Sequence, residues 1–231
     1  MIRVSVIVCC YNDGRFLARA LESLTRQTLP SDQLELILVN DGSTDDTESV
    51  ALSFDRKLNL KYIRNDANKG LPASCNAGLE RATGEYFIRL DADDLFEPSI
   101  LEEMSAVLHS GRADLVYSDR FEFVAATNEK RYVSVAEFSV FNLTAIGTML
   151  RTNKVVGIGG YRNMFWEEYD LYMRYLMPDR KVFHIPEALF THTLRAGSMT
   201  TNAERVKRGW AELKELWPDQ ILRTFGEYDE H

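Results

Sequence analysis

The sequence predicts an α/β fold with a mostly parallel central sheet that is flanked by helices and carries a small antiparallel element. Two observations predict this fold. Short apolar runs suited to buried strands alternate with segments whose apolar residues recur at helical spacing, and the rhythm holds to about residue 118. Strands connected through helices lie parallel to one another, with right-handed crossovers. Beyond residue 118 the rhythm breaks, which indicates irregular or antiparallel strands over residues 119–150.

The helices of the first half begin at residues suited to a helix N-terminus. An apolar stripe at helical spacing runs to about Gln27, and Ser43 can cap the second helix. Pro72 and Pro98 suit the first turns of the third and fourth helices. The strands that alternate with these helices are predicted at residues 3–9, 34–39, 60–64, 85–90 and 115–117.

The second half is predicted to be shorter in regular structure. It contains a helix at 166–176, two short strands at 181–185 and 188–193, and a C-terminal helix at 203–217. No repeat, low-complexity tract or linker divides the sequence, so residues 1–231 are predicted to form a single domain.

The composition excludes several classes of protein. A formal net charge of −8 argues against nucleic-acid binding, which requires clustered Lys and Arg. The three cysteines form no CxxC pair, which favours a reducing compartment. No apolar stretch is long enough for a signal peptide or a membrane span, so we predict a cytoplasmic protein. Peripheral attachment to the inner face of the membrane is kept as an alternative.

Two acidic clusters follow predicted buried strands. Asn40, Asp41 and Ser43 follow one strand, and residues 91–94 (Asp-Ala-Asp-Asp) follow another. Crowded carboxylates repel one another and resist burial, so packing alone does not explain them. The carboxyl ends of parallel strands are where open α/β sheets bind ligands, and carboxylate oxygens suit a divalent cation. The clusters therefore indicate an enzyme that handles a nucleotide-linked substrate.

Five motifs occur in the order that is typical of glycosyltransferase family 2, and the chain resembles that family. They lie at residues 4–12, 20–28, 40–45, 68–70 and 91–94. The resemblance implies the GT-A fold, a nucleotide-sugar donor and inversion of the sugar's anomeric configuration. It also divides the domain into a nucleotide-sugar-binding half (1–118), an acceptor-binding and catalytic-base half (119–202), and a C-terminal helix and tail (203–231).

The resemblance implies a pocket for the nucleotide base lined by Cys9, Tyr11 and Asp41. Tyr11 would stack on a pyrimidine, and Asp41 would accept a hydrogen bond from its imide N–H. The structural alternatives are a core aromatic at a strand end and a helix-start carboxylate. The same resemblance adds further donor-binding positions, namely Asn12, Lys69 and Ala92.

Asp91 and Asp93 resemble the DxD element of the family. Asp93 would bind Mn²⁺ or Mg²⁺ directly, while Asp91 would contact the ribose or a metal-bound water. Asp94 has the alternative role of capping the helix that Pro98 opens. The cation would neutralise charge that grows on the departing nucleoside diphosphate.

Residues 195–200 resemble a loop that closes over the diphosphate, with Arg195 and Ser198 as donor contacts. Many relatives carry His at the position of Arg195. Because a guanidinium cannot ligate a metal, Arg195 would grip the diphosphate instead. His184 and His192 are interpreted as satisfied structural histidines.

An inverting reaction needs a carboxylate that takes the proton of the acceptor hydroxyl. Residues 166–171 resemble the family segment that supplies this base, and Glu168 occupies the position of its usual Asp. Glu167 and Asp170 are the alternatives, and a solvated acidic helix start is the structural interpretation. The acceptor would be a glycan or a lipid-linked molecule.

Two other functions were weighed. A nucleotidyltransferase that makes activated sugars would show a Gly-rich, basic turn after the first strand, which the sequence lacks. A non-catalytic sugar-nucleotide- or glycan-binding protein on the same scaffold would not need the acidic pair and the base.

The C-terminal helix has an apolar stripe of Val206, Trp210, Leu213 and Trp217. The stripe is predicted to pack on the domain core or to form a homodimer, in preference to lying on a membrane surface.

Overall fold

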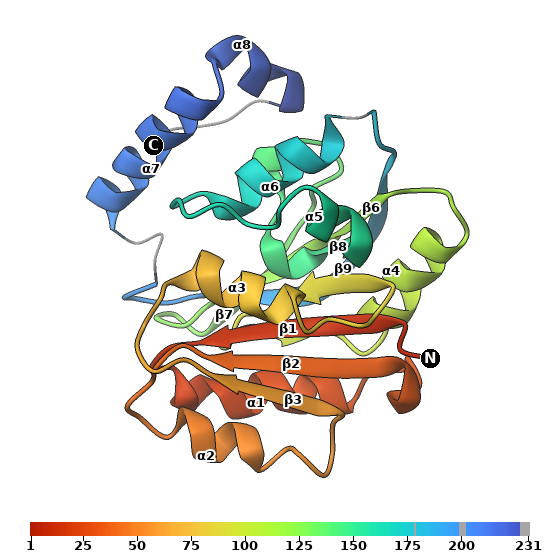
Figure 1. Cartoon of the computed structure of the whole chain (residues 1–231). Helices are drawn as coiled ribbons and strands as arrows, with labels where there is room; N and C mark the ends of the chain where they lie inside the picture. Colours follow the sequence, from red (N-terminus) through yellow and green to blue (C-terminus); the bar gives the residue numbers. More distant parts are fainter. Residues whose placement is uncertain (178, 199–201, 227–231) are drawn as a thin grey trace.

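The structure, a computed structural model, describes residues 1–177, 179–198 and 202–226 (Figure 1). In this part of the chain one sheet of nine strands has the order β3-β2-β1-β4-β8-β6-β9-β5, and β7 pairs with β6. The strands are β1 (Val4–Cys10), β2 (Leu34–Asn40), β3 (Leu60–Arg64), β4 (Tyr86–Arg89), β5 (Leu95–Phe96), β6 (Leu115–Val124), β7 (Glu129–Val133), β8 (Thr148–Arg151) and β9 (Val182–Leu194).

The sheet combines the two strand arrangements that the sequence predicts. Strands β3, β2, β1 and β4 pair in parallel with one another, and β6 pairs in parallel with β9. Strand β8 runs antiparallel between β4 and β6, and β7 and β5 are antiparallel at the margins. The predicted α/β fold with a small antiparallel element is therefore confirmed.

Helices cover both faces of the sheet (Figure 1). Alternate residues of β1 face two hydrophobic cores. Val4, Val6 and Val8 belong to the core that includes residues of α1, α2 and α4, and Ile7 belongs to the core that includes residues of α3, α6 and α7. The helices are α1 (Gly14–Thr25), α2 (Thr47–Leu52), α3 (Leu71–Leu79), α4 (Ile100–His109), α5 (Thr152–Gly157), α6 (Glu167–Leu176), α7 (Ala203–Leu216) and α8 (Asp219–Leu222).

The strands predicted at 115–117, 181–185 and 188–193 were wrong in length. The strand predicted at 115–117 extends to Val124, and the two short strands predicted at 181–185 and 188–193 are a single strand, β9. The register jumps from the pair Ser118–Ile185 to the pair Asp119–Ala188, so Pro186 and Glu187 bulge out of the ladder. Because proline lacks an N–H donor, the bulge keeps it inside a continuous strand.

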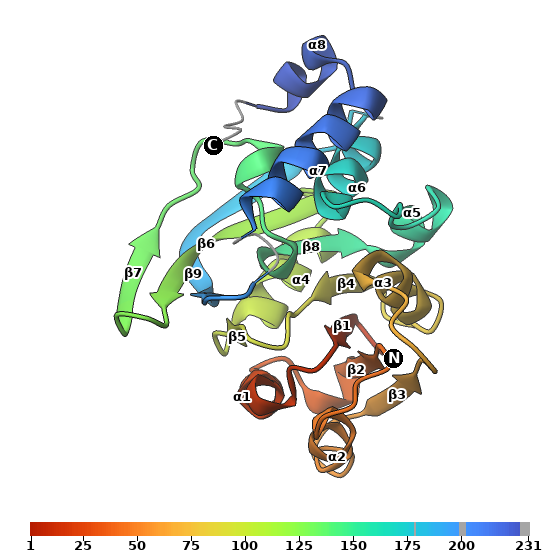
Figure 2. The ribbon, with the colours of Figure 1, turned by 90° about the vertical axis from the view of Figure 1, so that its left-hand side faces the viewer.

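The C-terminal helix packs on the domain, beside α6 in Figure 2. Trp210, Leu213 and Trp217 are buried in the same core cluster as α6, and the Trp210 ring contacts Trp166 and Tyr169. The prediction that this stripe packs on the core is confirmed. Its apolar side chains are therefore already covered, and a membrane or a second subunit would have to use other residues.

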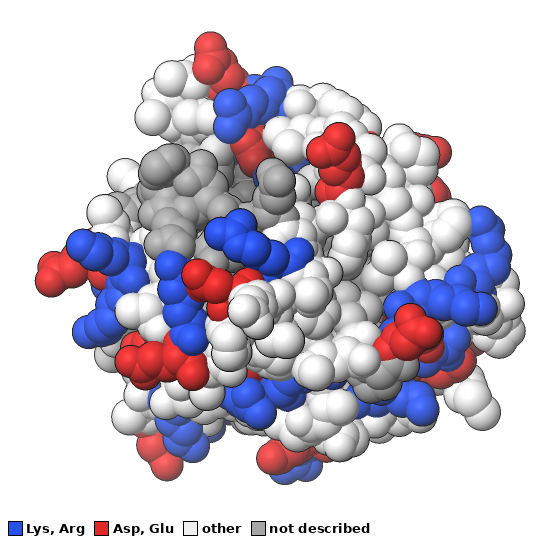
Figure 3. Space-filling model, turned by 90° about the horizontal axis from the view of Figure 1, so that it is seen from above, with Lys and Arg blue, Asp and Glu red and all other residues white. Residues whose placement is uncertain are grey.

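None of the helices in the described ranges has the length and apolarity needed to cross a bilayer. Lys and Arg are interspersed with Asp and Glu on the face shown in Figure 3.

Trp217 anchors the tail through a hydrogen bond from its indole Nε1 to the Asp170 carboxylate at 3.0 Å. Trp217→Phe should therefore lower the free energy of unfolding by about 1–3 kcal/mol beyond the effect of lost volume, because the bond is buried and its acceptor is charged. Urea unfolding would measure it. Trp166→Phe is a matched control, since the buried Trp166 Nε1 has no hydrogen-bond partner among the described residues. Equal losses in the two variants would contradict the anchoring role.

Candidate active site

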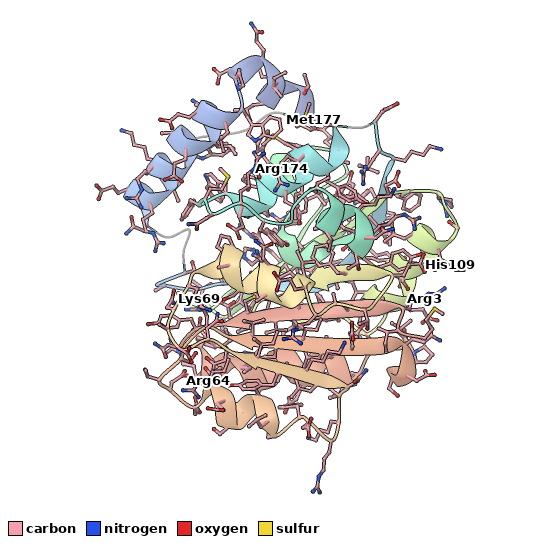
Figure 4. The ribbon with its side chains drawn as sticks, viewed as in Figure 1. Arg3, Arg64, Lys69, His109, Arg174 and Met177 are labelled. Carbon is pink, nitrogen blue, oxygen red and sulfur yellow. The ribbon has the colours of Figure 1, made fainter. Side chains whose placement is uncertain are left out.

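The predicted site residues gather where the parallel strands β1, β2 and β4 end. Lys69 and Arg64 lie at this edge of the sheet, whereas Arg3 and His109 lie at the opposite one (Figure 4). Strand β2 ends at Asn40 and β4 at Arg89, and both pair in parallel with β1. The two acidic clusters therefore share one edge of the sheet, as parallel pairing requires.

Asp41 is buried and organises the loop that follows β3. Its Oδ1 accepts hydrogen bonds from Asn65 Nδ2 at 2.7 Å and from the Lys69 N–H at 2.9 Å, and its Oδ2 accepts one from the Gly70 N–H at 3.0 Å. A carboxylate has about four acceptor positions, so three are already filled. Lys69 meets Asp41 through its backbone, and its side chain is exposed.

The structural alternative for Asp41, a helix-start carboxylate, is wrong. Helix α2 begins only at Thr47, whose N–H donates to Asp45 Oδ1 at 3.1 Å. Ser43, predicted to cap that helix, instead accepts a hydrogen bond from the Asn12 N–H at 3.0 Å. The intervening turn places Asp41 and Ser43 too far from the helix to cap it.

Asn12 joins the turns that follow β1 and β2. It has the left-handed φ of 54° that asparagine tolerates, and its Oδ1 accepts a hydrogen bond from the Thr44 N–H at 2.8 Å. The neighbouring Tyr11 is 47% exposed, so its ring is not the core aromatic of the structural alternative. The site therefore has an exposed aromatic ring held next to a fixed turn.

Two thiols lie beside this part of the site. Cys9 Sγ and Cys75 Sγ are 3.6 Å apart. The hydrogen bond to Cys75, followed by burial, raises the pKa of Cys9 well above its usual value. The thiol is therefore neutral, which suits an uncharged base ring.

Both carboxylates of the DxD element are paired with arginines. Asp91 Oδ1 lies 2.9 Å from Arg89 Nε, and Asp93 Oδ2 accepts a hydrogen bond from Arg195 Nε. Arg195 also donates through Nη2 to Asp13 Oδ2 at 2.8 Å. Asp93 and Arg195 line a hollow of about 100 Å³, smaller than the roughly 300–1,000 Å³ of typical ligand sites.

The other two residues of the acidic cluster at 91–94, Ala92 and Asp94, have structural roles. Ala92 is buried in the core. Asp94 accepts a hydrogen bond from the Thr193 N–H at 2.6 Å, and burial, followed by Asp91 and Asp93, raises the pKa of Asp94 well above its usual value. Asp94 does not cap the following helix, which begins at Ile100 after Ser99.

The loop predicted to close over the diphosphate is only partly described. The Ser198 N–H donates to the Arg195 carbonyl at 3.4 Å, in a turn. Residues 199 and 200 lie outside the described residues.

The three candidate bases occupy different environments at the start of α6. Glu167 is buried and paired with Arg89 at 2.9 Å. Asp170 is fully buried and accepts hydrogen bonds from Arg162, Arg174 and Trp217. Glu168 is half-buried, and among the described residues its carboxyl group forms no hydrogen bond or ion pair with another side chain. Burial, followed by the charge of Glu167, raises the pKa of Glu168 to about 8. Of the three, Glu168 is the one whose carboxyl group is not held by an arginine.

Arg89 is a site residue that the sequence analysis missed. It is buried, and its Nη1 donates to Glu167 Oε1 while its Nη2 donates to Asp91 Oδ2 at 3.2 Å. It therefore connects the DxD element to the helix of the candidate base. The signal in the sequence was a single arginine inside the apolar run of β4.

The two histidines differ. His184 Nε2 lies 2.7 Å from Asp119 Oδ1, and the ring stacks on Tyr117, so its structural interpretation is confirmed. His192 was expected to be satisfied as well, but its buried Nδ1 has no hydrogen-bond partner among the described residues. Burial, followed by the charge of Arg120, lowers the pKa of His192. The charges of Arg120, Asp91, Glu122 and Asp93 all act on the His192 ring.

Comparison with known proteins places the chain in a family of sugar-transferring enzymes. The model of "Glycosyl transferase family 2" matches residues 5–171. The chain is 30% identical to the amylovoran biosynthesis glycosyltransferase AmsE of Erwinia amylovora, over 91% of this chain and 81% of that protein. It is 27% identical to the cholesterol galactosyltransferase of Borreliella burgdorferi, over 99% of this chain and 70% of that one.

Solved structures share the fold. The S. aureus TarS fragment 1–349 in complex with UDP-GlcNAc superposes with a TM-score of 0.79 at 22% identity, over 97% of this chain and 71% of that one. The mannosyltransferase PcManGT of Pyrobaculum calidifontis, in complex with GDP-Man and Mn²⁺, gives 0.76 at 19% identity, over 92% and 64%. These similarities confirm the GT-A fold.

Proposed function

Because this chain belongs to glycosyltransferase family 2, we propose that it transfers a sugar, with inversion, from a pyrimidine nucleotide-sugar donor to an acceptor hydroxyl in glycan biosynthesis. The observation that carries the proposal is the Arg89 bridge. Through it the DxD carboxylate Asp91 and the helix of Glu168 meet at one edge of the sheet. A donor site and a base on opposite sides of one cleft are what an in-line displacement requires.

The donor side would be built from the turns after β1 and β2. The exposed Tyr11 ring would stack on the base, next to the neutral Cys9 thiol. Asp41 has one acceptor position left, which would take the imide N–H of a uracil. The complex of TarS with UDP-GlcNAc supports a uridine nucleotide on this fold.

Asp93 and Asp91 would hold a divalent cation, because carboxylate oxygens are hard ligands of the kind that Mn²⁺ and Mg²⁺ prefer. Asp93 Oδ1 accepts no hydrogen bond from the described residues, which leaves one hard oxygen free for a cation. Bound there, Mn²⁺ or Mg²⁺ would neutralise the departing diphosphate. PcManGT, which shares the fold, was solved with Mn²⁺.

Glu168 would act as the base. Its carboxylate would take the proton of the acceptor hydroxyl while that oxygen attacks the anomeric carbon, and the nucleoside diphosphate leaves from the opposite face. Arg195, a planar and permanently charged donor, would bind the diphosphate oxygens. The named relatives act in polysaccharide biosynthesis and on cholesterol, so the acceptor would be a glycan or a lipid-linked molecule.

The decisive experiment is a donor screen with a stacking variant. Purified protein with Mn²⁺ would be titrated with UDP, GDP and their sugars, and transfer would be measured on soluble glycans and on lipid acceptors in vesicles, before and after EDTA. Tyr11→Ala should weaken UDP binding by about 5–150-fold, because base stacking on an aromatic ring contributes about 1–3 kcal/mol.

Tyr132→Ala, which removes another exposed tyrosine outside the site, is the control. Binding of UDP without transfer to any acceptor would favour a non-catalytic sugar-nucleotide-binding protein. Release of pyrophosphate from UTP and a sugar phosphate would favour a nucleotidyltransferase.

A further inference from the structure

Arg195 occupies the place where a cation would approach Asp93. Its Nε donates to Asp93 Oδ2, and its Nη2 donates to Asp13 Oδ2 at 2.8 Å. The guanidinium also lies over the Phe16 ring, with its Cζ atom 4.6 Å from the ring centroid. Three chain segments thus hold one arginine: the turn after β1, helix α1 and the segment after β4.

This ion pair competes with a metal for the same carboxylate. Mg²⁺ and Mn²⁺ coordinate carboxylate oxygens directly, so the single negative charge of Asp93 would be shared between the cation and the guanidinium. A cation on the free Asp93 Oδ1 would lie within a few ångströms of the guanidinium and be repelled by it. The guanidinium is only 15% exposed, so solvent screens that repulsion weakly.

A nucleoside diphosphate offers Arg195 a better partner. The guanidinium fork matches phosphate oxygens and can bind them through two parallel N–H···O bonds, whereas it makes one bond to each of Asp93 and Asp13. If the arginine moves to the phosphates, Asp93 loses its counter-ion and becomes free for the metal. The remaining partner of the arginine, Asp13, is 27% exposed and can be hydrated when the pair opens.

We propose that Arg195 is an exchangeable counter-ion that makes cation binding depend on the nucleotide. In the structure it pairs with Asp13 and Asp93, an arrangement that would keep divalent cations off Asp93. A bound donor diphosphate would take over the guanidinium and leave Asp93 open to a cation. Asp13 is accordingly the positioning residue that holds Arg195 in the ligand-free state. This inference rests on the proposed function for its second step, the exchange with the diphosphate.

The first step is tested by titrating Mn²⁺ alone and measuring free Mn²⁺ by electron paramagnetic resonance. Arg195→Gln should bind Mn²⁺ at least about tenfold more tightly than the natural chain, because one competing positive charge is gone. Arg19→Gln is the matched control: Arg19 lines the same hollow, is exposed, and has no ion pair among the described residues. Its affinity should stay within about twofold of the natural chain. In an Arg195→Gln/Asp93→Asn double variant the gain should disappear, which would assign the bound ion to Asp93.

The second step is tested by repeating the titration with saturating UDP. UDP should tighten Mn²⁺ binding in the natural chain by about tenfold or more, and by clearly less in Arg195→Gln. Equal Mn²⁺ affinities of the natural chain and Arg195→Gln without UDP would overturn the competition, and thermal melts would exclude misfolding as the cause. Tighter binding by Arg195→Gln together with no effect of UDP on either protein would keep the competition and overturn the proposed donor. These two failures are therefore distinguishable.

Discussion

Replacing Glu168 with glutamine should lower the rate of sugar transfer by about 10²–10⁴-fold, the usual contribution of a general base. The amide is nearly isosteric but cannot take the proton of the acceptor hydroxyl. UDP binding should stay within about twofold, because Glu168 lies on α6 and not on the turns proposed to hold the nucleotide. Steady-state transfer kinetics and calorimetric UDP titration would measure the two effects.

The same residue sets the pH dependence. A base must be ionised to act, and the pKa of Glu168 is raised to about 8 by burial and by the charge of Glu167. Below that value kcat/KM should fall about tenfold for each pH unit, and above it the profile should level off. Glu168→Asp, which restores the residue usual at this position in the family, should retain much of the activity and its pH limb. Unchanged transfer by Glu168→Gln would show that the base lies elsewhere.

The other two acidic side chains of this helix illustrate what the sequence could not distinguish. Glu167, Glu168 and Asp170 all lie in the first turn of α6, where the dipole favours negative charge. Their roles separate through their partners: Arg89 and Trp217 are distant partners of Glu167 and Asp170, whereas Arg162 and Arg174 bind Asp170 from nearby in the sequence. These contacts make Asp170 a structural anchor for the C-terminal tail.

The predictable parts of the fold were those with local signals. Strands β1 to β4 followed from apolar runs and from the turn residues that end them. Strand β5 was missed, and β8 was expected only as an unplaced antiparallel strand within residues 119–150, because both pair with segments that are distant in the sequence. The bulge in β9 was read as a gap between two strands, since Pro186 looks like a strand end in the sequence.

The candidate site was predictable in its residues and not in its pairings. The motifs placed Asp41, Asp91 and Asp93 at strand ends, where the structure has them. Asp91 pairs with Arg89, only two residues away. The pairs Arg89–Glu167, Arg195–Asp93 and Arg195–Asp13, however, join positions 78, 102 and 182 residues apart. Such long-range pairings depend on the tertiary fold, so they could not be predicted from spacing.

Replacing Arg89 with methionine should lower the free energy of unfolding by about 3–5 kcal/mol, the usual cost of removing one partner of a buried ion pair. Glu167 would be left charged and buried, whereas Asp91, which is 33% exposed, can be hydrated. Urea unfolding at pH 7 would measure the loss. Arg64→Met breaks the exposed pair with Glu48 and should cost less than about 1 kcal/mol.

Two further measurements separate this cost from lost packing. In an Arg89→Met/Glu167→Met double variant the stranded charge is gone, so most of the stability should return. The loss in the single variant should also shrink at low pH. The pKa of Glu167 is raised by burial already in the natural chain, so its folded form binds a proton more tightly than the unfolded form. Protonation therefore relieves the unpaired charge as the pH falls, and stability declines as the pH rises above the usual carboxyl range. A loss that stays constant with pH and persists in the double variant would mean that Arg89 contributes through packing, and that the charge bridge between the donor site and the base is dispensable.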